Sequence, residues 1–204
     1  MSEAQQAWEK HYGARERVWS GRVNVRLAEL AEPMSPGRAL DLGCGEGADA
    51  IWLAEHGWHV TAVDISQTAL DRAAVEAANR DLTTRIDFQR HDLTQSFPSG
   101  EFDLVSAQFL HSTVQMDRAQ LLRRAADAVA GGGNLVVVDH GAPPPWTSHQ
   151  HRHEFPSAVE VVSSLNLDES RWDRVQVDTV ERDALGPEGQ QAALIDNVML
   201  LRRR

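Results

Sequence analysis

Several residue types that mark common protein classes are almost missing from this chain of 204 residues. The one cysteine, Cys44, cannot form an internal disulfide and fits a reducing compartment. The one lysine and the one tyrosine, Lys10 and Tyr12, do not form a Tyr-x-x-x-Lys pair. This absence argues against the hydride-transfer site that many nicotinamide-dependent reductases use.

Long apolar runs and an excess of basic charge are also missing. No apolar run approaches the ~20 residues that a helix needs to cross a bilayer. Residues 1–10 are polar and lack the apolar stretch of a signal peptide. The formal net charge is −10 at pH 7, so nucleic acid would receive little electrostatic help in binding. We therefore expect a cytoplasmic protein with no membrane or nucleic-acid partner.

The most informative segment present is 38–47, Arg-Ala-Leu-Asp-Leu-Gly-Cys-Gly-Glu-Gly. A short apolar run leads into a glycine-dense turn, and a helical pattern follows at once. Glycines at alternate positions let the backbone approach a ligand closely, and the helix behind them offers unpaired N–H groups. This pattern predicts a nucleotide-type binding loop between a strand and a helix.

The acids around this loop indicate which kind of ligand it holds. Gly43, Gly45 and Ala48 also satisfy the dinucleotide fingerprint G-x-G-x-x-G/A, so the glycines alone do not decide. A pyrophosphate at the helix N-terminus favours cations and bare N–H groups. Here Asp41, Glu46 and Asp49 crowd that position instead. We expect these acids to disfavour phosphate and to favour a positively charged ligand such as the sulfonium S-adenosylmethionine.

Strands and helices alternate along the middle of the chain. The expected strands are 38–42, 58–63, 85–90, 102–107 and 134–139, and the expected helices are 47–56, 67–80 with Ser66 as N-cap, and 117–130. Helices 4–12 and 22–32 precede this core; a long loop at 140–156, a helix at 157–165 and two strand-like runs at 172–180 and 192–202 follow it. Strands joined by single helices predict a parallel sheet with right-handed crossovers.

The motifs along this core resemble one known family. Residues 41–47 are similar to the first motif, D/E-x-G-x-G-x-G, of class I S-adenosylmethionine-dependent methyltransferases. The run 58–66 resembles the second strand with its terminal acid, and His91-Asp92-Leu93 resembles the acid after the third strand. Residues 101–105 and 131–138 resemble the fourth and fifth strands, so the resemblance covers 38–140 in order. It is nearest to the small single-domain group around the tellurite- and thiopurine-type methyltransferases.

The resemblance implies a fold and a domain organisation. The expected fold is α/β, a three-layer Rossmann-like class I methyltransferase sheet, mostly parallel, with an antiparallel C-terminal hairpin at one edge. We expect a single domain, 1–204, in which 1–36 form an N-terminal helical lid, 37–140 the cofactor-binding core, and 141–204 a cap loop and the C-terminal strands.

The resemblance also implies S-adenosyl-L-methionine as cofactor, with S-adenosyl-L-homocysteine as product. The cofactor-binding residues that it implies are Trp19, Asp41, Gly43, Cys44, Gly45, Asp64, Ile65, Asp92, Leu93 and Gln108. Asp64 would hold the ribose hydroxyls, Asp92 the adenine amine, and Trp19 would belong to the lid. Several of these residues have structural alternatives: Asp41 and Asp64 as acids at helix starts, Ile65 and Leu93 as core residues, Cys44 as a packing residue, and Trp19 as a contact between helix and sheet.

Two histidines follow strands whose carboxyl ends should face the transferred methyl group. His111 follows the fourth strand and His140 the fifth, and either imidazole can accept a proton near neutral pH. Both are candidate catalytic residues, with His111 preferred; the alternative is that each only satisfies backbone groups at a strand end. Phe109, Trp146 and Phe155 would supply an apolar wall for the acceptor.

The remaining expectations concern partners. The segment 106–111 lacks the Asn/Asp-Pro-Pro-Tyr/Phe signature of enzymes that methylate amino groups of adenine, cytosine or glutamine, so a small-molecule acceptor is expected for a monomer or homodimer. His149, His151 and His153 alternate in a polar loop without a second ligand cluster, and we predict no metal site. Two alternatives stay open: a non-catalytic S-adenosylmethionine-binding or regulatory protein, and an NAD(P)-dependent reductase.

Overall fold

The computed structural model describes residues 1–112, 114, 116–146, 155–186 and 189–204. The helices are α1 (Glu3–Gly13), α2 (Val25–Ala31), α3 (Ala48–Glu55), α4 (Gln67–Ala78), α5 (Arg118–Asp127) and α6 (Ala158–Ser164). The strands are β1 (Arg38–Leu42), β2 (His59–Asp64), β3 (Ile86–Arg90), β4 (Phe102–Gln108), β5 (Val129–His140), β6 (Trp172–Leu185) and β7 (Gln191–Arg203).

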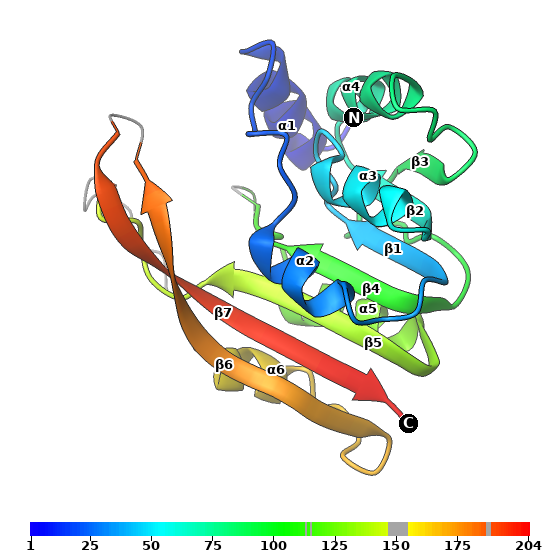
Figure 1. Cartoon of the computed structure of the whole chain (residues 1–204), viewed down its shortest axis with the longest axis vertical. Coiled ribbons are helices and arrows are strands. Elements are labelled where there is room, and N and C mark those ends of the chain that lie inside the picture. Colours follow the sequence, from blue (N-terminus) through cyan, green and yellow to red (C-terminus); the bar gives the residue numbers. More distant parts are fainter. Residues whose placement is uncertain (113, 115, 147–154, 187–188) are drawn as a thin grey trace.

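The strands form one sheet in the order β3-β2-β1-β4-β5-β7-β6. The first five strands in this order are parallel, and β7 runs antiparallel to both β5 and β6. Helices α2 and α3 lie on one face of the sheet, and α5 and α6 lie on the other (Figure 1). This arrangement confirms the predicted mostly parallel α/β sheet with an antiparallel hairpin edge.

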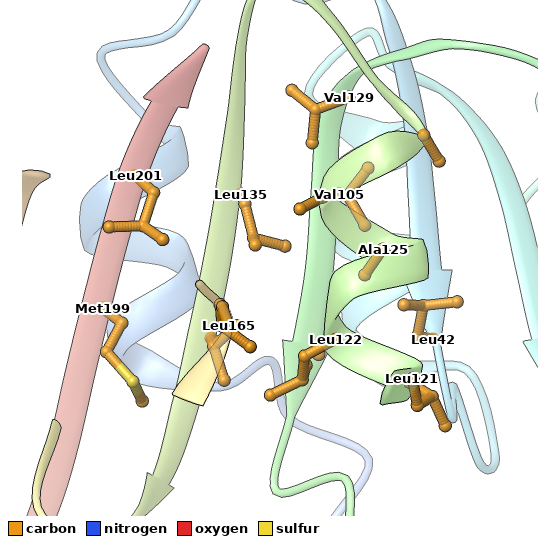
Figure 2. Packing of buried hydrophobic residues seen from close by; sticks show 14 of the residues in the cluster. Leu42, Val105, Leu121, Leu122, Ala125, Val129, Leu135, Leu165, Met199 and Leu201 are labelled. Atoms are coloured by element: carbon orange, nitrogen blue, oxygen red, sulfur yellow. The ribbon is translucent and has the colours of Figure 1, made fainter. Parts of the chain in front are cut away.

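The sheet separates two apolar clusters. On one face Leu121, Leu122 and Ala125 of α5 pack over the central strands (Figure 2). On the other face Leu27 of α2 and Leu53 of α3 are fully buried with the residues of the second cluster. Both clusters end near the carboxyl ends of the parallel strands, where polar groups become frequent.

Two strands are longer than the sequence pattern predicts. The fifth strand begins at Val129 instead of 134, because the glycine turn is absorbed into the strand with a shift of register between Phe102 and Leu104 of β4. Strand β6 continues to Leu185 instead of ending at 180, so the hairpin extends past His140, the last residue of β5. This end of the hairpin and α1 lie on the side to which the arrowheads of β4 and β5 point (Figure 1).

Among the described residues, no helix is long and apolar enough to span a bilayer. The part of the 140–156 loop at 147–154 lies outside the described residues, and so do His149, His151 and His153.

Candidate active site

The glycine loop after β1 is fixed to the end of β2. The backbone N–H groups of Gly43 and Cys44 both donate to the carbonyl of Val63, over 2.8 and 2.9 Å. Gly43, Gly45 and Gly47 have φ values of +73°, +54° and +83°, a region that disfavours side chains. The loop therefore needs glycine at each of these positions, and its end leads directly into α3.

Asp64 ends β2 and completes the loop. Its Oδ2 accepts from the N–H of Gly45 over 2.9 Å, and its Oδ1 accepts from the N–H of Ser66 over 2.9 Å. The side chain is buried, and this burial raises the pKa of Asp64 although the backbone N–H groups oppose the shift. A carboxylate can accept about four hydrogen bonds, so Asp64 has further capacity to accept one from a ligand hydroxyl.

A second buried carboxylate lies beside the same loop. Asp41 is 1% exposed within β1, and its Oδ2 has no hydrogen-bond partner in the described part of the chain. Burial raises the pKa of Asp41 strongly, and the charges of Asp49 and Asp64 raise it further. Burial also raises the pKa of Asp49 to about 6. An unpaired buried carboxylate is costly, so this position favours a positively charged partner.

The N-terminal segment covers the loop with aromatic side chains. The indole Nε1 of Trp19 donates to the hydroxyl of Tyr12 over 3.0 Å. A Cβ added at Gly45 would lie 2.9 Å from the Tyr12 oxygen and 3.3 Å from Trp19 Nε1. Tyr12 is 3% exposed and Trp19 is 50% exposed. The structure thus brings Trp19 to the glycine loop, as expected, and adds Tyr12 to the same place.

Glu46 holds this segment against the loop. Its carboxylate accepts from the N–H groups of Val18 and Trp19, at 3.0 Å for Trp19, and pairs with Arg72 at 2.8 Å. Arg72 also donates to the carbonyls of Tyr12 and Arg15. Burial raises the pKa of Glu46, but these hydrogen bonds outweigh burial and leave the pKa below its usual value.

Asp49, like Glu46, accepts from a backbone N–H group of the N-terminal segment. Its Oδ1 accepts from the N–H of Asn24 over 2.6 Å. Glu46 and Asp49, two of the three acids that the sequence places at the loop, both bind backbone N–H groups of the segment 18–24. The acids left at the loop for a ligand are Asp41 and Asp64.

Three other predicted cofactor residues lie farther along the sheet edge. Asp92 accepts from the hydroxyls of Ser2 and Thr94, at 2.8 and 2.6 Å, which ties it to the start of α1. Leu93 is buried in the core cluster under α5, and Ile65 is half-buried beside Asp64.

Two predicted cofactor residues lie nearer the centre of the sheet. Gln108 ends β4 and donates through Nε2 to Ser106 Oγ over 2.9 Å, while its buried Oε1 has no partner within the described residues. Cys44 is half-buried, and burial followed by the charges of Asp64 and Asp41 raises the pKa of its thiol. A raised thiol pKa fits a packing residue, because the thiolate is the reactive form.

The turn after β4 brings the two candidate catalytic histidines together. Phe109 has a φ of +49°, and its ring stacks on that of His140 with 4.3 Å between centroids. The His111 and His140 rings are nearly parallel, with centroids 6.3 Å apart. A Cβ added at Gly43 would lie 2.6 Å from Leu110 Cδ1, so Leu110 places this turn directly against the glycine loop.

The C-terminal hairpin closes the far side of the histidines. Asp196 of β7 is opposite His140 in the sheet, is fully buried, and accepts from Arg182 Nε over 2.5 Å. Arg26 of α2 lies 3.9 Å from the same carboxylate and donates to the carbonyl of Glu181. Burial, followed by the charge of His111, lowers the pKa of His140, which favours its neutral form.

The predicted apolar wall is partly placed by the structure. Phe109 contacts His140, as described. Trp146 packs near the hairpin, because a Cβ added at Gly186 would lie 2.8 Å from Trp146 Cε3. Phe155 is half-buried just before α6.

Sequence reasoning missed Tyr12, Glu46 in its structural role, and Leu110. Tyr12 had a signal, because Trp8, His11 and Tyr12 share one face of α1 at helical spacing, and their rings lie 5.3 to 6.0 Å apart. Glu46 and Leu110 had none, since their partners are distant in sequence. Among the described residues, no group of three His, Cys, Asp or Glu side chains could hold a metal ion.

The comparisons with known proteins agree with this geometry. Residues 39–133 match the family described as "Methyltransferase domain". The chain is 34% identical over 171 residues to probable thiol methyltransferase 2 of Arabidopsis thaliana, a match that covers 78% of this chain and 76% of that relative. It is 35% identical over 121 residues to 27-O-demethylrifamycin SV methyltransferase of Amycolatopsis mediterranei, covering 58% of this chain and 44% of that relative.

A solved structure shares the fold over nearly the whole chain. It is described as "Conversion of a Disulfide Bond into a Thioacetal Group during Echinomycin Biosynthesis" and aligns with a TM-score of 0.74 at 22% identity, over 98% of this chain and 92% of that one. Three observations point to the same family. They are the fold, the glycine loop with its acids, and the Arabidopsis relative, which aligns over most of both chains. The chain therefore belongs to the class I S-adenosylmethionine-dependent methyltransferases.

Proposed function

We propose that this protein transfers a methyl group from S-adenosyl-L-methionine to a small-molecule acceptor. The observation that carries the proposal is the pair of buried carboxylates, Asp41 and Asp64, beside a glycine loop at the carboxyl ends of parallel strands. Ligands of open α/β sheets bind at this edge. The unpaired oxygen of Asp41 supports a ligand with positive charge, as S-adenosylmethionine has on its sulfonium and ammonium groups.

The residues present fit this cofactor better than a dinucleotide. A pyrophosphate at the start of α3 would lie near Asp41 and Asp64, and the cation nearest in the network, Arg72, is already paired with Glu46. Like charges in a poorly solvated site repel strongly. The left-handed glycines leave room for close approach of a ligand to the backbone, and Tyr12 and Trp19 are placed to cover it.

The chemistry divides between cofactor and protein. When bound, the cofactor supplies an electrophilic methyl group on a positively charged sulfur, so the protein mainly orients the reactants and excludes water. Asp64 would bind the ribose hydroxyls through its remaining lone pairs. Leu110 and Tyr12 would limit water at the glycine loop, and His111 would accept the proton of a protic acceptor.

A small acceptor is supported by charge and by the named relatives. The net charge of −10 disfavours a polyanionic substrate. The relatives are described as acting on a thiol and on 27-O-demethylrifamycin SV, and both are small molecules. This chain spans less than half of the rifamycin relative, so its own acceptor has to be found by experiment.

Calorimetry and product analysis test the proposal together. We expect S-adenosylmethionine and S-adenosylhomocysteine to bind and NAD or NADP not to bind measurably. Incubation with S-adenosylmethionine and a metabolite pool should give methylated products in the mass spectrum. Tight NAD binding would support the reductase alternative. Cofactor binding without methylated product or S-adenosylhomocysteine formation would support the non-catalytic alternative.

A further inference from the structure

One arginine joins the turn after β4 to the end of β5. Arg118, the first residue of α5, donates through Nε to the carbonyl of Leu110 over 3.0 Å. Its Nη2 donates to Oδ1 of Asp139, and the two side chains are 18% and 4% exposed. A charge-assisted pair with so little exposure is held more firmly than a surface ion pair. Arg118 therefore fixes Asp139 and the backbone next to His111 relative to each other.

The same carboxylate lies beside His111. The His111 Nε2 is 3.6 Å from Oδ1 of Asp139, which is beyond hydrogen-bond length but within reach of an ion pair. The other oxygen of Asp139 is buried and finds no hydrogen-bond partner among residues that the structure describes. The His111 side chain is 48% exposed, so solvent reaches part of its ring.

His111 and His140 lie in different electrostatic surroundings. Burial raises the pKa of Asp139, and Arg118 opposes that shift. His140 faces His111, and behind it lie Asp196 and Arg182; burial and the charge of His111 together lower the pKa of His140. His140 is thus held neutral against Phe109, while His111 has a carboxylate within 3.6 Å.

We propose that Asp139 is a positioning residue for His111, held in place by Arg118. The Asp139 carboxylate attracts the N–H of one His111 imidazole nitrogen. The other nitrogen then accepts the proton of the hydroxyl or thiol of the methyl acceptor. Asp139 stabilises the imidazolium by its negative charge. The site would therefore serve acceptors that must lose a proton. This inference rests on the proposed function, in which His111 is the proton acceptor.

The contact can be tested without activity. We would follow the imidazole NMR signals of the folded apo protein through a pH titration and assign His111 with His111→Asn. Asp139→Asn removes the negative charge and should lower the pKa of His111 by about 0.5–1 unit. Arg118→Gln removes the opposing charge and should raise it. An unchanged His111 pKa in both variants, with folding confirmed by thermal unfolding, would overturn the proposal.

Kinetics then test the positioning role. With an acceptor in hand, Asp139→Asn should lower kcat about 10-fold or more, move the acidic limb of the pH–rate profile to lower pH, and leave the KM for cofactor unchanged. Asp173→Asn, which removes a carboxylate from an exposed pair with Arg204, is the matched control and should change neither quantity. In Asp139→Asn alone, Arg118 is left without its carboxylate partner and the fold could suffer. The double variant Asp139→Asn with Arg118→Gln removes both charges and controls for this effect.

The outcomes separate the two proposals. A shifted His111 pKa with an unmoved pH–rate profile would overturn the positioning role while methyl transfer stands. Absence of methyl transfer by the unmodified protein would refute the proposed function, and the NMR titration would still decide whether Asp139 acts on His111.

Discussion

At the scale of single residues, the main feature of the site is a pair of carboxylates that are buried from solvent. Asp41 and Asp64 are 1% and 7% exposed, and burial raises the pKa of both. Asp64 is compensated by two backbone N–H groups, whereas one oxygen of Asp41 has no partner in the described chain. Such uncompensated burial is costly for folding and is concentrated at functional sites.

The role of Asp64 can be measured directly. Asp64→Ala should weaken S-adenosylmethionine binding by about 1–3 kcal/mol, because it removes charged acceptors for the ribose hydroxyls and frees the N–H of Gly45. Calorimetry measures the loss. Asp71→Ala, an exposed acid on α4, is the control and should bind normally. Unchanged affinity of the Asp64 variant would mean that this carboxylate does not contact the cofactor.

Removing the His111 imidazole tests general base catalysis. His111→Ala should lower turnover by about 100-fold or more once an acceptor is known, while cofactor affinity stays intact. His140→Ala is the comparison, and it should cost less because the pKa of His140 is lowered and its ring stacks on Phe109. Near-normal turnover of the His111 variant at all pH values would leave positioning alone as the source of catalysis.

At the scale of elements, the N-terminal segment is attached to the site mostly through its backbone. Glu46 accepts from Val18 and Trp19, and Asp49 accepts from Asn24. Within α1, Glu9 accepts from the N–H of Gln67 over 2.6 Å at the start of α4. Few buried apolar contacts and many polar ones are typical of elements that open at low free energy. We therefore expect the lid to comprise residues 1–24 and not the predicted 1–36, because Leu27 of α2 is fully buried in the core.

Weakening one of these attachments should open the lid. Glu46→Gln removes the charge that holds Arg72 and weakens the bonds to Val18 and Trp19, so amide exchange of residues 15–24 should become roughly 10-fold faster. S-adenosylmethionine should slow exchange there and change Trp19 fluorescence. Exposed Glu16→Gln, in the same segment, is the control. If neither exchange nor fluorescence responds to cofactor, the segment is a fixed part of the fold and no lid.

At the scale of the whole molecule, the buried acids link stability to pH in an unusual direction. Most paired carboxylates have lowered pKa values, so their stabilisation is lost as pH falls. Burial raises the pKa of Asp49 to about 6, well above its unfolded value. The folded state then binds the extra proton between these two values, and the contribution of Asp49 to stability is lost as pH rises through about 6.

Comparing two variants isolates this contribution. Relative to Asp49→Asn, which stays neutral, the unmodified apo protein should gain about 1 kcal/mol of unfolding free energy on going from pH 7 to pH 5. Urea unfolding at the two pH values measures the difference, and histidine titration cancels between the proteins. Asp173→Asn should give no such difference, because the hydrogen bond from Arg204 lowers the pKa of Asp173 and keeps its titration away from this pH range. If the unfolding free energies of the unmodified protein and Asp49→Asn differed equally at pH 7 and pH 5, the raised pKa of Asp49 would be contradicted.

The sequence by itself determined the order of elements and the place of the ligand loop, because these follow from local rules. Ser66 caps α4 by accepting from the N–H of Ala69, and β1 spans Arg38–Leu42, both as the residue pattern predicted. The expected strand at 85–90 is β3, Ile86–Arg90, at one edge of the sheet. Apolar periodicity, capping residues and glycine turns act within a few residues and can be read directly.

Only the tertiary structure decided which polar groups meet. Glu46 binds residue 18, which is 28 positions away, and Arg118 pairs with Asp139, 21 positions away. No local pattern marks such partners, because they are brought together by the order of strands, the packing of α1 against α4 and the packing of α5 on one face of the sheet. The acids of the glycine loop were therefore visible in the sequence, but only the folded chain showed that Glu46 and Asp49 bind the N-terminal segment.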